Sequence, residues 1–201
     1  MAHYAISELL IVLAALWGAN RLVAQDRATA AFGLLLFGAA AAIGVVRFPF
    51  GLIEPWADMH RFAGMMGGLL AMMALVHQIV RFETARLTPG AHMALAALGL
   101  GLALAMPELR VPLFLLWSLG FIWLAARHTP KRHTRKREAS AWIKAGVAGF
   151  MLFNVIVFRQ SPYLDPAVSW HIFHVLVAVW VVGVSWLLTS SVTGKADVKK
   201  S

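Results

Sequence analysis

Two histidines stand three residues apart where an apolar segment begins. The stretch SWHIFHVL, residues 169–176, contains His171 and His174. Residues three apart share one face of a helix, so the two imidazoles could bind one metal ion or a haem iron. Histidines at the boundary of an apolar segment can also be interfacial side chains without chemistry. The neighbouring polar residues must decide between these interpretations.

Several other polar side chains are expected at the same membrane depth. Polar and ionisable residues inside membrane segments are costly, so each is a candidate functional residue. A carboxylate together with several histidines is typical of a zinc site. The whole set consists of Glu8, Arg47, Asp58, His60, Asn154, His171 and His174. Within it, the expected metal ligands are His60, His171, His174 and Asp58.

Asp58 and Arg47 are the expected catalytic residues. Asp58 would act as a general base or as a fourth metal ligand. Arg47 cannot bind a metal, because a guanidinium is always charged, but it could pair with Asp58 or bind an anionic head group or a developing oxyanion. Taken singly, Arg47 could also snorkel to lipid head groups and Asp58 could begin a helix. Asp58 and His60 lie about 200° apart around a regular helix, so only one of them is expected to face a common centre.

The composition places these residues in an integral membrane protein. Of the 201 residues, 60% are hydrophobic and only 13% are charged, whereas soluble domains average about 25% charged residues. The chain has no cysteine, which excludes disulfides and thiolate chemistry. No basic region precedes the first apolar segment and no small-residue cleavage site follows it, so this segment is expected to remain in the protein.

The apolar segments predict an all-α protein with seven transmembrane helices. A membrane-spanning helix needs about 20 mostly apolar residues. The expected segments are 5–23, 28–48, 57–81, 90–107, 111–127, 141–159 and 167–190. The fourth and fifth are the weakest, since only PELRVP (107–112), a predicted turn, separates them. We expect one transmembrane domain over residues 1–193 and a disordered basic cytoplasmic tail over residues 194–201.

The loop charges predict the orientation of these helices. With seven segments, one side of the membrane carries most of the basic residues, including the run 127–144, whereas the charges on the other side are nearly balanced. The positive-inside rule then places the N-terminus outside and the C-terminus inside. The expected location is a bacterial-type cytoplasmic (inner) membrane. The basic run is interpreted as a topology anchor next to anionic lipid, so nucleic acid is not an expected partner.

The segment WHIFHVLV, residues 170–177, resembles the last helix of a known superfamily of seven-helix membrane proteins. This superfamily contains alkaline ceramidases, progestin/adiponectin-type receptors and haemolysin III-like proteins, and many members are zinc-dependent amide hydrolases. Their last helix carries H-x-x-x-H, and His174 stands at its second histidine. Asp58 follows Arg47 by eleven residues and matches the family aspartate at the start of the third helix. The ceramidase branch also has the orientation inferred above.

The chain departs from the family motifs at three positions. Arg47 stands where the second helix of the family has a histidine, and Ile43 stands where it has a serine. Trp170 occupies the position of the first histidine in the last helix, and His171 follows one residue later. Two of the three family zinc histidines are therefore replaced. Either the zinc was lost and a polar pocket remains, or His60, His171 and His174 form a rearranged site.

Three functions follow from these observations. The first is a zinc-dependent membrane hydrolase of a lipid amide or ester, with a membrane lipid or lipid-like substrate and a metal-activated water. The second is a b-type haem protein, in which the outer histidines hold one haem and His77 with His92 hold another. The third is a non-enzymatic protein that binds a lipid or small ligand in a degenerate polar pocket.

Overall fold

The chain forms α-helices wherever the sequence predicts an apolar segment. The computed structural model describes residues 2–83, 89–127 and 134–190, and the side chain of His92 lies outside this description. No strand occurs within these residues, which confirms the all-α prediction. The expected tail 194–201 and part of the basic run 127–144 lie outside the described residues. The elements are α1 (Tyr4–Val23), α2 (Ala28–Arg47), α3 (Ala57–Glu83), α4 (Pro89–Ala105), the short 3-10 turn η1 (Pro107–Leu109), α5 (Arg110–Arg127), α6 (Thr134–Val157) and α7 (Pro166–Ser190).

Six of the described helices are long and apolar enough to cross a membrane, and α4 is the exception. The apolar part of α4 covers only Met93–Ala105, which is shorter than the roughly 20 residues that a span requires. The prediction of a helical membrane protein is therefore confirmed, whereas the seventh span is not. The weak fourth segment of the sequence corresponds to this shorter helix.

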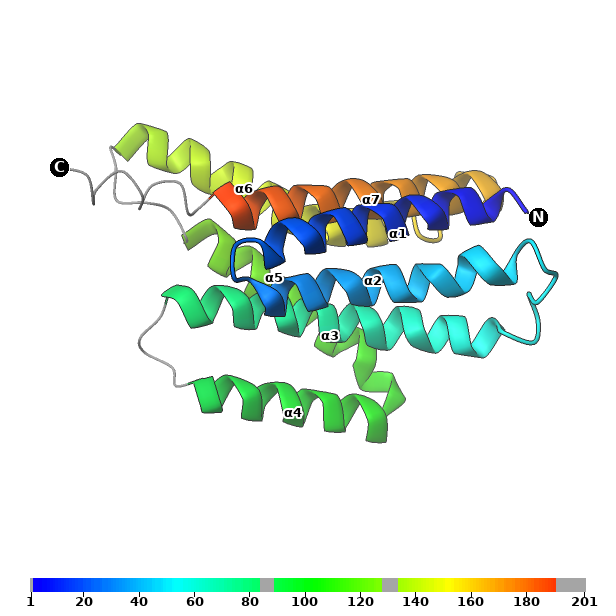
Figure 1. Cartoon of the computed structure of the whole chain (residues 1–201), viewed down its shortest axis with the longest axis horizontal. Helices are drawn as coiled ribbons and strands as arrows, with labels where there is room; N and C mark the ends of the chain where they lie inside the picture. The colour runs from blue at the N-terminus through cyan, green and yellow to red at the C-terminus, as the bar shows by residue number, and fades with distance from the viewer. Residues whose placement is uncertain (1, 84–88, 128–133, 191–201) are drawn as a thin grey trace.

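Within the described residues, six helices follow one another around a ring. α1 contacts α2, α2 contacts α3, α3 contacts α5, α5 contacts α6, α6 contacts α7, and α7 returns to α1. α4 lies outside the ring, against α3 and α5 (Figure 1). Successive helices along the chain alternate in direction. α1, α3 and α7 begin at the end of the bundle that is on the right in Figure 1, and α5 begins further in from that end and runs the same way. That end carries the candidate site.

Small residues allow the first three helices of the ring to approach closely. A Cβ at Gly38 in α2 would lie 2.9 Å from the Cβ of Ala15 in α1. A Cβ at Gly33 would lie 3.1 Å from the backbone oxygen of Ala71 in α3. Glycine and alanine let helix backbones pack closely where no hydrophobic effect drives helices together within lipid. These contacts fix α1 and α3 on the two sides of α2.

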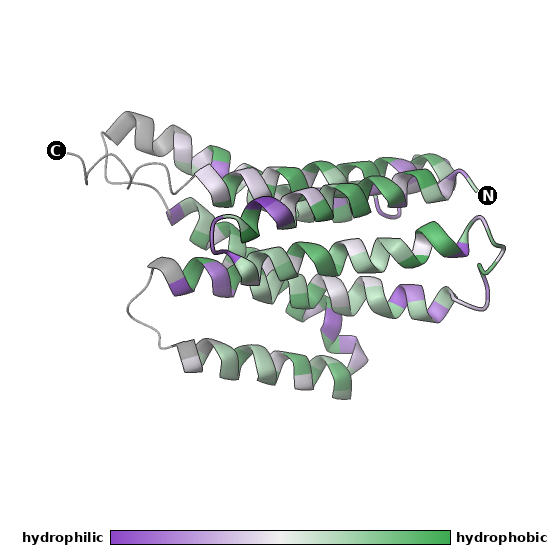
Figure 2. Cartoon of the chain, in the orientation of Figure 1, coloured by the Kyte–Doolittle hydropathy of each residue, from purple (hydrophilic) through white to green (hydrophobic). Residues whose placement is uncertain are grey.

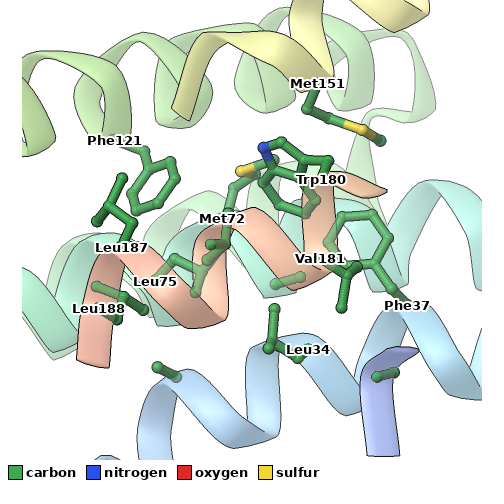
Figure 3. Close-up of a cluster of buried hydrophobic side chains, with 14 of the residues drawn as sticks. Leu34, Phe37, Met72, Leu75, Phe121, Met151, Trp180, Val181, Leu187 and Leu188 are labelled. Atoms are coloured by element: carbon green, nitrogen blue, oxygen red, sulfur yellow. The ribbon is translucent and has the colours of Figure 1, made fainter. Parts of the chain in front are cut away.

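Large buried side chains fill the middle of the ring (Figure 3). Trp180 of α7 packs edge-on against Phe37 of α2, with 5.2 Å between ring centroids. Met72 of α3, Phe121 of α5 and Met151 of α6 belong to the same cluster. Trp180 lies about 9 Å along α7 from His174. The cluster therefore lies next to the candidate site, toward the middle of the bundle, and forms the floor of that site. Hydrophilic residues concentrate toward the helix ends (Figure 2).

Candidate functional site

A cavity of about 740 Å³ lies above this floor, among the six helices of the ring. Its polar wall includes Glu8 from α1, Arg47 from α2, His60 from α3, and Trp170 and His174 from α7. The structure thus brings together Glu8, Arg47, His60 and His174 of the predicted set. Arg61, Arg110 and Arg159 also line it.

Glu8 lies at the centre of the polar wall. It is only 1% exposed, and its Oε1 lies 3.3 Å from Nε2 of His60 and 3.5 Å from Nε2 of His174. The neighbouring helix leaves room for it, because a Cβ at Gly44 would lie 2.5 Å from Glu8 Oε1. A buried carboxylate in a membrane helix is expected to have a function or a charged partner. Glu8 is therefore the residue around which the site is built.

Arg47 determines the protonation of His60. Nη1 of Arg47 lies 2.8 Å from Nδ1 of His60. A guanidinium has donors but no acceptor, so Nδ1 of His60 must accept this hydrogen bond. The neutral imidazole then carries its hydrogen on Nε2, the nitrogen that faces Glu8. Arg47, His60 and Glu8 thus form one chain of polar contacts.

In His174 the other ring nitrogen, Nδ1, carries the hydrogen. Its Nδ1 donates a hydrogen bond to the backbone oxygen of Trp170 at 2.7 Å, since a carbonyl oxygen can only accept. The ring of Trp170 stacks on His174 with 4.2 Å between centroids. Nε2 of His174 is left to face Glu8. The two histidines therefore approach the carboxylate from α3 and α7 through Nε2, but in these neutral forms only Nε2 of His60 carries a hydrogen.

His171 shares the α1-facing side of α7 with His174 but has different partners. Its Nδ1 lies 3.1 Å from Oγ of Ser7, and its ring stacks on Tyr4 at 5.3 Å. The two histidines therefore contact adjacent residues of α1, Ser7 and Glu8. His171 is not among the described residues that line the cavity. The i, i+3 spacing correctly predicted a shared face, but the two imidazoles do not meet at one centre.

Asp58 lies away from the site. Its side chain is 92% exposed and pairs with Arg61 one turn later, at 3.4 Å. His60, two residues further, faces the cavity, as the angular separation on the helix required. The partner of Arg47 is His60 rather than Asp58. The catalytic and ligand roles of Asp58 stay predictions that this placement does not support.

No catalytic or ligand role was expected of Glu8 or Trp170. Glu8 belongs to the predicted polar set, and it is the sole carboxylate in the segment 5–23. Trp170 occupies a position at which the resemblance predicts a histidine. Both line the cavity, and both have a buried polar atom without a hydrogen-bond partner, Oε1 and Nε1 respectively. Arg47 has such an atom as well, its Nε.

The side chains around the cavity offer few donor atoms to the predicted cofactors. Among the residues that the structure describes, no three histidine, aspartate or glutamate side chains form a group that could hold a metal ion. In the observed arrangement Nε2 of His60 carries a hydrogen and offers no lone pair to zinc. The zinc centre stays a prediction. The haem alternative, which needs His92, also stays a prediction.

Comparison of the chain with family models, with curated proteins and with solved structures gives no match.

Proposed function

We propose that the protein binds an amphipathic molecule with an anionic head group in this cavity, within the outer half of a membrane. One observation carries the proposal: four arginines and a single glutamate line a cavity whose remaining wall is mainly apolar. The four arginines are Arg47, Arg61, Arg110 and Arg159.

The arginines approach the cavity from separate parts of the ring. Arg47 ends α2, Arg61 lies in the first turns of α3, Arg110 begins α5, and Arg159 follows α6. Guanidinium groups bind phosphate and carboxylate through paired hydrogen bonds and are well suited to such heads. Arg47 is nearly buried, at 9% exposure, so an anion beside it would be partly shielded from water and bound more strongly. An anionic group is the natural complement of this wall.

The remaining wall suits a hydrocarbon chain. It includes Phe37, Met65, Phe114, Met151 and Val177. The volume of about 740 Å³ lies within the roughly 300–1,000 Å³ range of small-molecule sites. Methionine and aromatic side chains adapt to flexible apolar ligands. A lipid with its chain toward the Trp180 cluster and its head among the arginines satisfies both parts of the cavity.

The proposed orientation of the protein in the membrane follows from the distribution of charge. At the end of the bundle opposite the cavity the basic residues outnumber the acidic ones. Arg21, Arg27, Arg81, Arg127 and Lys144 stand there with Asp26 and Glu83 as acidic neighbours, whereas Arg47, Arg61, Arg110 and Arg159 at the cavity end are balanced by Glu54, Asp58, Glu108 and Asp165. Basic residues favour the cytoplasmic side. We therefore place the N-terminus and the cavity on the outer side of the membrane.

Binding of single-chain lipids to the purified protein tests the proposal. Lysophosphatidic acid and lysophosphatidylcholine of equal chain length differ in whether the head group has a net negative charge. We expect the anionic lipid to bind at least about tenfold more tightly. Its phosphate has no attached cation, so its negative charge is fully available for charge-assisted hydrogen bonds to arginine. Arg47→Gln should remove most of this preference.

Arg21→Gln is the matched control. Arg21 lies at the opposite end of the bundle and stacks on Trp17, so its loss should leave the preference unchanged. Equal binding of both lipids by the wild-type protein would refute the proposal. Equal effects of the two substitutions would also refute it.

A further inference from the structure

Three buried polar atoms beside the cavity lack a hydrogen-bond partner. Two belong to donors, Nε of Arg47 and Nε1 of Trp170. The third is an acceptor, Oε1 of Glu8, whose contacts with Nε2 of His60 and of His174 at 3.3 and 3.5 Å are not hydrogen bonds. All three residues line the cavity. Nearly all buried polar groups in folded proteins have a partner, either within the protein or in water or ligand. An unpaired polar atom in the wall of a cavity is a candidate contact for a polar atom of a ligand.

The three side chains are close together. Nη1 of Arg47 bonds to His60, whose ring centroid lies 6.2 Å from that of Trp170. Glu8 Oε1 lies 3.3 Å from the other side of the same imidazole. His60 thus contacts Arg47 through Nδ1 and Glu8 through Nε2. The two donors and the carboxylate therefore lie around the same imidazole.

We propose that the site recognises an anionic lipid that carries a free hydroxyl close to its anionic group. Arg47 Nε and Trp170 Nε1 donate to oxygens of the anion, and Glu8 Oε1 accepts the hydrogen of the hydroxyl. This inference rests on the proposed function and adds to it the chemical class of the head group.

The charges around Glu8 favour a neutral hydroxyl over other donors. A carboxylate only accepts hydrogen bonds and repels a second anion, so the phosphate or carboxylate of the ligand must lie on the arginine side. An ammonium group could donate to Glu8, but it would meet the repulsion of the four arginines that line the same cavity. A hydroxyl is neutral and can donate a hydrogen bond to Glu8 without electrostatic repulsion from the arginines.

The test compares two ligands in the wild-type protein. The probes are lysophosphatidic acid, which has a free hydroxyl near its phosphate, and the deoxy analogue with the same chain and phosphate. We expect the hydroxyl compound to bind about tenfold more tightly, the effect of one hydrogen bond to a charged acceptor. This comparison needs no substitution and therefore does not depend on how well a variant folds.

Two substitutions assign the preference to Glu8. Glu8→Gln removes the charge at nearly constant size, and the preference should fall to about threefold or less. Ser7→Ala changes the adjacent residue, which contacts His171 outside the cavity, and should keep the full preference.

The outcomes separate this inference from the proposed function. If the wild-type protein binds both phosphates equally and Arg47→Gln weakens both, the hydroxyl inference is wrong and the anion site stands. If the wild-type protein prefers the hydroxyl but Glu8→Gln keeps the preference, Glu8 is not its origin. If neither phosphate binds, both proposals fail.

Discussion

Arg47 donates from Nη1 to Nδ1 of His60 across 2.8 Å, and this contact decides which nitrogen of His60 carries a hydrogen. Because arginine can only donate, the His60 hydrogen lies on Nε2 and faces Glu8. Arg47 thus organises the polar wall. A histidine at position 47 would have made a different site.

The tautomers of the two histidines are directly measurable. Nitrogen chemical shifts of labelled histidine should show His60 with its hydrogen on Nε2 and His174 with a hydrogen on Nδ1, because Arg47 and the Trp170 carbonyl impose these forms. Arg47→Gln should release His60 from this form while leaving His174 unchanged. A His60 signal with its hydrogen on Nδ1 in the wild-type protein would contradict the assigned contact.

Gly44→Ala should displace Glu8. The new methyl group would overlap Glu8 Oε1, which lies 2.5 Å from the Cβ position. We expect a loss of about 1–3 kcal/mol in the free energy of unfolding, the usual range for overpacking, together with a weaker preference for the hydroxylated lipid. Thermal unfolding and the two-ligand comparison measure these effects.

Gly146→Ala is the control for that substitution. A Cβ there meets nothing within 4 Å, and alanine favours a helix over glycine by up to about 1 kcal/mol. Stability should therefore stay equal or rise. A Gly44→Ala protein as stable as the Gly146→Ala protein, with intact ligand preference, would show that Glu8 does not depend on this space.

Zinc should not stabilise the purified protein. The hydrogen on Nε2 of His60 must be lost and Arg47 must move before that nitrogen can bind a metal. We expect the same melting temperature with excess zinc and with a chelator, since a ligand stabilises only the state that binds it. A rise with zinc that disappears in His60→Ala and His174→Ala would instead support the metal centre suggested by the family resemblance.

The orientation can be tested with single cysteines, because the chain has none. Tyr163, 93% exposed in the loop between α6 and α7, lies at the cavity end, and Ala24 lies in the turn after α1 at the other end. A membrane-impermeant maleimide added to intact cells should label Tyr163→Cys and spare Ala24→Cys. The reverse pattern would place the cavity on the inner side.

The sequence alone determined the helical framework. Long apolar segments can satisfy their backbone hydrogen bonds in lipid only as helices or closed barrels, and the segment limits closely match the observed helices. The sequence also showed that Asp58 and His60 could not share a centre, because the angular spacing of a helix is a local property. The i, i+3 rule similarly predicted that His171 and His174 would face the same neighbour.

Only the tertiary structure decided which polar residues meet. Glu8 and His174 are far apart in sequence, and their contact depends on the rotation and depth of α1 against α7, which packing of the whole ring sets. The pairing of Arg47 with His60 rather than Asp58 depends on the same rotations. Local patterns carry no information about them, since the apolar sides of these helices are broad and permit several rotations. The ionisable residues are evident in the sequence. Only helix packing brings Glu8, Arg47, His60 and His174 into contact with one another.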